Sequence, residues 1–239
     1  MPRGVEQIAK KYASKIEAKL GLSVDFSKPL GCGSFGCVYK TSDERRVVKV
    51  SVDPTEGSVT KAIIESGLDK KLVGLARFDD LWRIPSAVRR RDAWVILRED
   101  IQPLFGSNHP MDRKEVGDAL SAYNSGMRRA IEHGLYDPKG PRTESDRRAA
   151  ENAKELADDA LSILRGNAEG WSLAEAIEEL AERSIVLADV HMGNVGFRVH
   201  DWSEEGGQES GSDSLLIFDP GHSSAQAVGE IAELKGRSA

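Results

Sequence analysis

The sequence has few of the residues that cross-link a protein or hold a structural metal ion. Of its 239 residues only two are cysteines, Cys32 and Cys37. Two cysteines are too few for a disulfide framework, and no cluster of histidines completes a zinc site around them. We therefore expect both cysteines to be reduced thiols in a cytoplasmic protein.

Long apolar runs and an excess of positive charge are also missing. No run approaches the ~20 apolar residues that cross a bilayer, and residues 1–6 lack the apolar core of a secretory signal. The net charge of −6 argues against a protein that coats nucleic acid. Hydrophobic and charged fractions of 39% and 30% are typical of a globular protein. We expect neither a membrane nor a nucleic-acid partner.

The chain begins with a helical pattern. Apolar residues recur every four positions from Ile8 to Leu20, with charged residues between them, and Gly21 is a suitable helix end. The pattern predicts a helix over residues 5–20 that packs through its apolar stripe. Residues 1–22 are assigned to this helical segment.

A glycine-rich stretch follows, with the pattern Gly31-x-Gly33-x-x-Gly36-x-Val38. Glycines let a backbone adopt positive φ and approach a phosphate chain closely, and Ser34 lies within the stretch. In a dinucleotide-binding fold this motif opens a helix. Here residues 37–40 continue as a strand, and a charged turn leads to a second strand over residues 46–50. We therefore predict a hairpin with a phosphate-binding turn.

The second strand carries Lys49 among valines. A buried lysine needs a partner, although a lysine that reaches solvent along its stem is the alternative. Residues 53–56 begin a helix, with a capping acid, a proline at its first position and a glutamate at its third. We predict that this helix runs to about Leu72. Within it, Glu65 is the expected partner of Lys49, and Glu56 is expected to serve as a cap.

The middle of the chain passes from strands to helices. Residues 84–88 and 93–97 form a second predicted hairpin, and Glu99 lies where the chain leaves the sheet. Apolar residues then recur at helical spacing over residues 112–135, 145–165 and 172–182. We expect an α+β fold of two lobes. The first, residues 23–102, is an N-terminal antiparallel sheet with one helix, and the second, residues 103–239, is compact and mainly helical.

A polar stretch near residue 190 lies between apolar runs. Asp189, His191 and Asn194 place an acid, an imidazole and a carboxamide within a few residues, and such groups are costly in a core when unpaired. Asp-x-x-x-x-Asn is the spacing at which a phosphotransferase places its base and a magnesium ligand. A strand, a hairpin tip over residues 203–214 and a return strand lead to Asp219. Asp219 is either the second metal ligand or an ordinary turn acid, and a short helix is expected around residues 226–234.

Taken in order, these elements resemble the protein-kinase-like superfamily. The form Asp-x-His-x-Gly-Asn, followed by a hairpin and Asp-Pro, is most similar to the short serine/threonine kinases of lytic podovirus-type bacteriophages. Leu187 and Ala188 replace the usual His-Arg, and Pro220 replaces the aromatic residue after the metal-binding acid. The resemblance covers residues 30–224.

The resemblance implies a kinase that uses ATP and Mg²⁺ and phosphorylates host bacterial proteins. It implies that Asp189 is the base, that His191 stabilises the transferred phosphoryl group, and that Asn194 and Asp219 hold Mg²⁺. The implied ATP contacts are Gly31, Gly33, Ser34, Gly36, Val38, Lys49, Glu65 and Glu99.

Two other functions stay open. A small-molecule kinase of the aminoglycoside or sugar-amine type also uses Asp-x-His-x-Gly-Asn. Such chains usually carry further helices after the metal-binding acid, whereas only 15 residues follow Ser224 here (239 − 224), which favours a protein acceptor. An inactive kinase fold that acts as a binding module is the other alternative. The retention of Lys49, Asp189, Asn194 and Asp219 argues against it.

Overall fold

The computed structural model describes residues 2–88, 91–105, 113–137, 139–183, 185–199 and 214–220. The chain forms two compact units. The first holds residues 1–69 and 76–100, and the second holds residues 70–75 and 101–239. The first unit is built on an antiparallel sheet with helices and the second is mainly helical, so the predicted α+β fold class is confirmed.

The first unit begins with two helices, α1 (Pro2–Lys11) and α2 (Ala13–Leu20), in place of the single helix expected over residues 5–20. The break is confined to Tyr12, whose φ and ψ are −105° and 9°. Helical hydrogen bonds continue on both sides of it, so the apolar stripe stays aligned. The predicted end at Gly21 is confirmed, because its φ of 66° lets its N–H bond back to the last turn.

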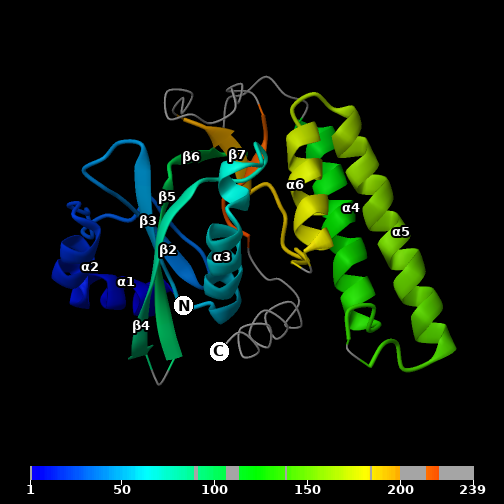
Figure 1. The fold of residues 1–239 in the computed structure, drawn as a ribbon, viewed down its shortest axis with the longest axis horizontal. Helices are drawn as coiled ribbons and strands as arrows, with labels where there is room; N and C mark the ends of the chain where they lie inside the picture. The colour runs from blue at the N-terminus through cyan, green and yellow to red at the C-terminus, as the bar shows by residue number, and fades with distance from the viewer. Residues whose placement is uncertain are drawn as a thin grey trace. The chain divides into compact units, whose positions relative to one another are not determined.

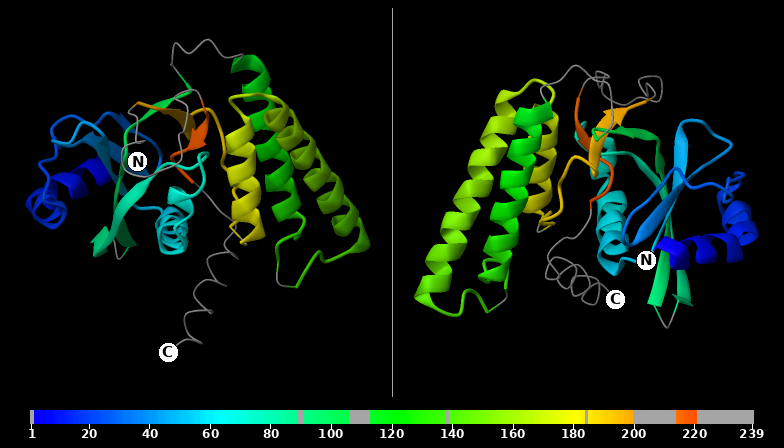
Figure 2. Two further views of the ribbon diagram at one scale, coloured as in Figure 1. Left: turned by 45° about the horizontal axis from the view of Figure 1, so that its top comes forward. Right: turned by 180° about the vertical axis from the view of Figure 1, so that it is seen from behind.

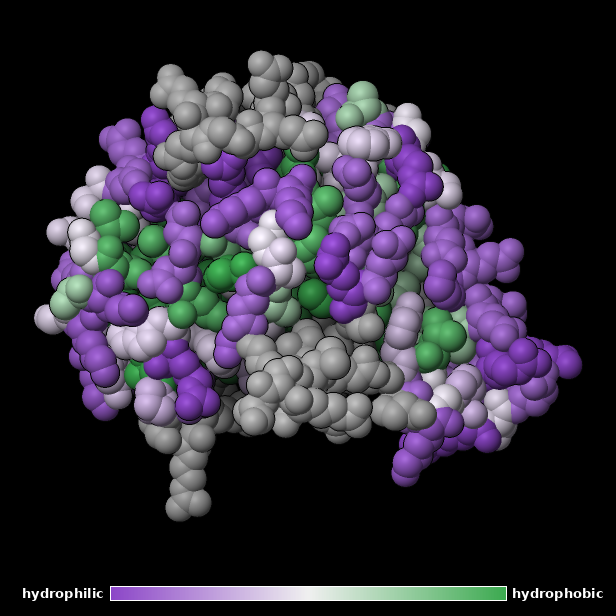
Figure 3. Space-filling view, viewed as in Figure 1, coloured by the Kyte–Doolittle hydropathy of each residue, from purple (hydrophilic) through white to green (hydrophobic). Residues whose placement is uncertain are grey.

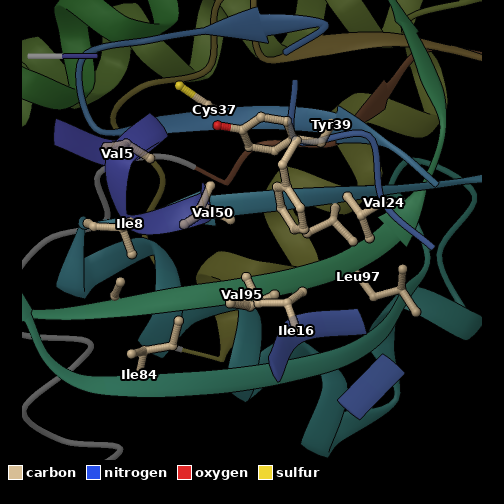
Figure 4. Close-up of a cluster of buried hydrophobic side chains, with 14 residues drawn as sticks. Val5, Ile8, Ile16, Val24, Cys37, Tyr39, Val50, Ile84, Val95 and Leu97 are labelled. Carbon is tan, nitrogen blue, oxygen red and sulfur yellow. The ribbon is translucent and has the colours of Figure 1, made fainter. Parts of the chain in front are cut away.

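The sheet of the first unit has five strands in the order β1–β2–β3–β5–β4, and all neighbours are antiparallel. Side chains alternate between the two faces of a strand. One face packs on α1 and α2 through a buried apolar cluster, which Figure 4 shows around Val50, Val95 and Ile16. The strands are β1 (Gly31–Cys32), β2 (Gly36–Lys40), β3 (Arg46–Ser51), β4 (Phe78–Val88) and β5 (Arg91–Glu99).

Helix α3 (Pro54–Ser66) covers the other face of this sheet. It begins as predicted, with Asp53 capping its first turn through the side chain. It ends earlier than the expected Leu72, because Gly67 adopts a left-handed φ of 66° and its N–H bonds carbonyls of the last turn. A 3₁₀ turn (Leu68–Lys70) follows.

The second unit contains three long helices, α4 (Arg113–Glu132), α5 (Glu144–Gly166) and α6 (Trp171–Glu182), close to their predicted bounds. α4 and α5 lie side by side (Figures 1 and 2). Gly126 of α4 makes this possible, since a Cβ there would lie 2.5 Å from the carbonyl oxygen of Ala153 in α5. On the face that Figure 3 shows, the surface over these helices is mostly hydrophilic.

A small sheet in the second unit has the strand order β6–β7–β8. Its strands are β6 (Ile101–Pro103), β7 (Val195–Arg198) and β8 (Leu216–Ile217). In its register, Val195 pairs with Ile217 and Gly196 with Leu216, so β7 and β8 form the hairpin that the sequence predicts after the polar stretch. Most of its expected tip, residues 203–213, and the expected helix at 226–234 lie outside the described residues. In the part of the chain that is described, no helix is both long and apolar enough to cross a membrane.

The close approach of α4 and α5 gives a stability prediction. Gly126→Ala should lower the free energy of unfolding by about 1–3 kcal/mol, because the added methyl group meets the backbone of α5, which cannot swing away. Urea unfolding of the full chain measures this change.

The matched control is Gly166→Ala at the end of α5, where a Cβ meets nothing within 4 Å. This variant should change the free energy of unfolding by no more than ~0.5 kcal/mol. Equal effects of the two substitutions would contradict the proposed close contact.

Candidate functional site

The first unit buries a lysine–glutamate ion pair on the sheet face that α3 covers. Lys49 Nζ lies 2.7 Å from Glu56 Oε1, and the two side chains are only 9% and 4% exposed. The second carboxylate oxygen of Glu56 accepts a hydrogen bond from the Ser51 hydroxyl at 2.6 Å. Buried charges are tolerated when they are paired and hydrogen-bonded. Glu56 therefore fixes the position of the Lys49 ammonium group.

Glu65, the expected partner of Lys49, does not form this pair. Its side chain is 46% exposed and lies 3.9 Å from Lys61 on the same helix. Nine positions separate the two glutamates (65 − 56), which is about two and a half helical turns, so they lie on opposite faces of α3. The predicted pairing of Lys49 with Glu65 is wrong, and so is the capping role given to Glu56.

Strands β1 and β2 form the predicted glycine hairpin, and Gly33 N donates to Gly36 O at 2.8 Å across its turn. None of the three motif glycines, all of them described, has a positive φ, so the turn does not use that freedom of glycine. A Cβ at Gly31 or Gly33 would meet nothing within 4 Å, whereas one at Gly36 would lie 2.9 Å from Lys49 Cε. Gly36 thus makes room for the lysine stem, and the turn stays open to a ligand.

Cys32 and Cys37 face each other across this hairpin and are joined by a disulfide. The prediction of two reduced thiols is therefore wrong. Their number alone suggested free thiols, but their places on either side of a short turn make them cross-strand neighbours. Among the described residues, one set of three acidic, histidine or cysteine side chains lies close enough together to share a metal ion, namely Glu6, Cys32 and Cys37. The disulfide occupies both sulfurs.

Three further predicted nucleotide contacts lie in the first unit. Ser34 is exposed in the hairpin turn, and Val38 lies opposite Lys49 in the register of β2 and β3. Glu99 is fully buried at the end of β5. Its side chain accepts the Arg77 N–H at 2.8 Å, and its own N–H donates to Arg77 O at 3.0 Å. These bonds give Glu99 a structural role at the end of β5, and its contact with a nucleotide stays a prediction.

Asn194 organises the polar stretch of the second unit. Its Nδ2 donates to Asp189 O at 2.8 Å and lies 3.5 Å from Asp189 Oδ2. Its backbone carbonyl oxygen accepts the N–H of Phe218 at 3.1 Å and that of Asp219 at 3.4 Å. The structure therefore brings Asp189, Asn194 and Asp219 together, with the β7–β8 hairpin returning Asp219 to the loop.

Two contacts from α4 support this loop, one buried and one partly buried, and neither residue was predicted from the sequence. Tyr123 donates its hydroxyl proton to Leu187 O at 3.0 Å, and Asn124 Oδ1 accepts the Val190 N–H at 2.8 Å. Burial raises the pKa of Tyr123, so its hydroxyl keeps the proton that it donates. The sequence offered one signal for Asn124, which is a carboxamide beside the apolar stripe of a predicted helix.

Arg128, one turn further along α4, holds the candidate base itself. Its Nε donates to Ala188 O at 3.0 Å, and its Nη2 lies 2.5 Å from Asp189 Oδ1. A guanidinium group that binds two neighbouring acceptors fixes both of them. Arg128 therefore sets the direction of the Asp189 carboxylate. Arg128 was not predicted from the sequence, because a charged residue on a helix usually faces solvent.

His191 lies beside the same carboxylate. Its Nδ1 accepts the Gly193 N–H at 3.0 Å, and its Nε2 lies 3.9 Å from Asp189 Oδ2. Because Nδ1 accepts, the ring proton of the neutral imidazole is on Nε2. His191 can thus present a hydrogen-bond donor next to Asp189.

A cavity of about 570 Å³ opens next to this loop in the second unit. Its described lining includes apolar groups, hydroxyl groups, an imidazole and the Arg128 guanidinium group, and none of these described residues is an acid. The residues that carry this chemistry are Phe105, Leu120, Ser121, Ser125, Arg128 and His191. The electrostatic character of the cavity favours neutral or anionic groups over cationic ones.

The oxygen groups around Asn194 fit a magnesium ion. Mg²⁺ prefers carboxylate and carboxamide oxygens and keeps several waters. The amide nitrogen of Asn194 is bound to Asp189 O, so its Oδ1 points away from that bond. The Oδ1 atom of Asn194 and the carboxylate of Asp219 are therefore the groups that could hold the metal ion.

Comparison with known proteins finds no matching family model and no matching curated protein sequence. Solved structures similar to this chain include a BubR1 kinase domain, with 15% identity over 95% of this chain and a TM-score of 0.40. This chain spans 63% of that domain's length. A spectinomycin phosphotransferase in complex with ADP and spectinomycin is 11% identical over 90% of this chain and 69% of its own, with a TM-score of 0.35. The AMP-bound complex of the same phosphotransferase is 12% identical over 90% of this chain and 70% of its own length, with a TM-score of 0.33. These scores are too low to carry an argument, so the assignment rests on the residues themselves.

The buried ion pair gives a second stability prediction. Glu56→Gln should lower the free energy of unfolding by about 3 kcal/mol, because the buried Lys49 ammonium loses its counter-charge. Glu65→Gln, on the exposed face of the same helix, should change it by less than ~0.5 kcal/mol. Urea unfolding measures both changes. A larger loss of stability in Glu65→Gln than in Glu56→Gln would indicate that Glu65 is the partner of Lys49, as expected from the sequence.

Proposed function

We propose that this chain is an ATP- and Mg²⁺-dependent phosphotransferase that phosphorylates a hydroxyl group, with protein serine or threonine as the favoured acceptor. The observation that carries the proposal is that Asn194 links Asp189 to Asp219, through its side chain to the one and through its backbone to the other. A base and two oxygen ligands at this spacing are the parts that phosphoryl transfer requires. The retained Lys49–Glu56 pair supplies the phosphate-binding cation.

The second unit supplies the proton chemistry. Asp189 accepts the proton of the acceptor hydroxyl as that oxygen attacks the γ-phosphorus of ATP. The bond from this phosphorus to the β,γ-bridging oxygen breaks, and ADP leaves. Arg128 and Asn194 hold the carboxylate in one orientation, so the hydroxyl meets a fixed acceptor. The Nε2–H of His191 donates to an oxygen of the transferred phosphoryl group, where a lysine is usual in the family that the sequence resembles.

The first unit supplies the nucleotide contacts. The glycine hairpin covers the phosphates with its open turn, and Lys49, held by Glu56, binds the α- and β-phosphates. Asn194 and Asp219 would hold Mg²⁺, which would supply positive charge next to the phosphates. Catalysis then consists of positioning and charge stabilisation.

The cavity beside Asp189 supports an acceptor that is neutral or acidic. The described residues of its lining carry the Arg128 guanidinium group and hydroxyl groups and include no acid. A polycationic aminoglycoside needs acidic partners, and these described residues offer it none. A serine or threonine flanked by acidic or polar residues fits better. The resemblance to bacteriophage kinases points to a host bacterial protein in the cytoplasm as the acceptor.

A hydroxylated small molecule is the second candidate acceptor. The cavity volume of about 570 Å³ lies within the range of small-molecule sites, ~300–1,000 Å³. The same charge argument restricts this candidate to neutral or anionic compounds, such as sugars or hydroxy acids.

Phosphoryl transfer is tested with labelled ATP and Mg²⁺, a bacterial lysate as protein acceptor and a panel of sugars and aminoglycosides. We expect label on protein, and Asp189→Asn should lower the rate by at least about 100-fold, because the base is lost. Asp118→Asn is the control, since Asp118 is an exposed acid of α4 paired with Lys114, and it should keep the wild-type rate.

Three outcomes separate the alternatives. Label on sugars alone supports the second candidate. Bound ATP with no transfer to any acceptor supports the binding module and contradicts the proposed enzyme. An Asp189→Asn variant with the wild-type rate shows that the base is another residue.

Arg128 gives a test of the acceptor preference. Arg128→Met should lower kcat/KM by roughly 10–100-fold on acidic serine peptides, because one charge-assisted contact and the orientation of Asp189 are lost together. Arg148→Met, at an exposed position of α5, is the control and should change nothing. Steady-state kinetics on acidic and basic peptides measure the effect, and equal use of both by the wild-type protein would contradict the preference.

A further inference from the structure

We propose that the Cys32–Cys37 disulfide is a reversible redox modification site that sets the affinity of the glycine hairpin for ATP. A dithiol reductant is the class of reactant that opens it. The presence of the bond rests on the structure alone. Its effect on ATP binding rests on the proposed function as well.

The bond lies at the neck of the hairpin turn. Cys32 pairs with Cys37 in the register of β1 and β2, and their Cα atoms are 4.1 Å apart. The enclosed residues are Gly33, Ser34, Phe35 and Gly36, and these form the predicted phosphate-binding turn. The cross-link therefore acts directly on the backbone that has to receive the phosphates.

The disulfide does not occupy the ligand-binding face. Along β2, Gly36 backs onto the Lys49 stem, whereas Cys37 points to the opposite face of the sheet. There it belongs to the cluster that includes Val5 and Tyr39 (Figure 4). A change at the sulfurs is thus transmitted to the ligand side through the backbone alone.

A role in overall stability does not account for the bond well. The entropy that a cross-link removes from the unfolded chain grows with the length of the loop, and here the partners are only five positions apart. Cys32 is exposed, whereas Cys37 is fully buried. An exposed disulfide can be reached by a reductant, which is typical of labile or regulatory bonds. Disulfides in reducing compartments are usually of this kind.

The reaction is a balanced thiol–disulfide exchange. A thiolate of the reductant attacks Cys32 Sγ, the S–S bond breaks, and the electron pair goes to Cys37 Sγ, which takes up a proton. The second thiol of the reductant then attacks the mixed disulfide and releases Cys32 as a thiol. The dithiol leaves as its own disulfide, so two electrons pass from reductant to protein.

The oxidised hairpin should bind ATP more tightly. The disulfide fixes its neck, while Gly33 N binds Gly36 O and Val52 N binds Phe35 O, each at 2.8 Å. A turn that is already ordered loses less conformational entropy when a ligand binds. Once the bond is open, ATP has to order the turn as it binds, and its affinity falls.

The test uses the full chain as isolated and after treatment with a dithiol. Thiols are counted with a chromogenic reagent in denaturant, and the ATP affinity is measured by calorimetry with Mg²⁺ present. We expect no free thiols before treatment and two after it, with the Kd for ATP rising at least about fivefold. Cys32→Ser should show the weaker affinity in both conditions.

Cys37→Ala removes the same bond with an apolar residue in the core and should reproduce the behaviour of Cys32→Ser. Two free thiols in the isolated, air-exposed protein would overturn the proposal, as would Kd values that agree within about twofold in the two redox states. Failure to bind ATP in either state would overturn the proposed function together with the effect on affinity. The thiol count would still report separately whether the bond forms.

Discussion

The candidate site depends on one residue, Asn194, through its side chain and its backbone. Its side-chain nitrogen holds Asp189 from one side, and its backbone carbonyl holds the end of the β7–β8 hairpin from the other. The side chain contributes the donor, and the backbone carbonyl, which every residue has, contributes the acceptor. An aspartate at this position could not donate to Asp189 O and would place a second negative charge beside the candidate base. The asparagine is therefore required both by the local fold and by the proposed chemistry.

Helix α4 holds the loop around Asp189 and Asn194 in place. Tyr123, Asn124 and Arg128 contact successive parts of the loop from one side of the helix. α4 in turn packs closely on α5 where Gly126 lies between two of these residues. A loop held by a packed helix loses little entropy when a substrate binds. The glycine that allows close packing and the side chains that orient the base thus belong to the same turn of helix.

Local patterns in the sequence predicted the elements of the fold, whereas contacts between elements were harder to predict. The glycine hairpin, the Asp53 cap and the return of Asp219 each follow from residues close together in the chain. The partner of Lys49 depends on which face of α3 meets the sheet. That face was readable, because Glu56, Val59, Thr60 and Ile63 are spaced at i, i+3, i+4 and i+7 and are all buried. Glu65 is half a turn away from this stripe. The contacts of Arg128 span some sixty positions (189 − 128 = 61) and had no comparable local signal.

The same contrast explains the cysteines. Counting two of them excluded a disulfide framework, and that conclusion still stands, since a single bond is not a framework. The count could not exclude a bond between neighbours, because pairing depends on geometry and the hairpin had already supplied it. Once the turn over residues 33–36 is accepted, the flanking positions must face each other across the two strands. A hairpin predicted for its glycines therefore predicts the disulfide as well, and it places a redox-sensitive bond beside the residues proposed to bind phosphate.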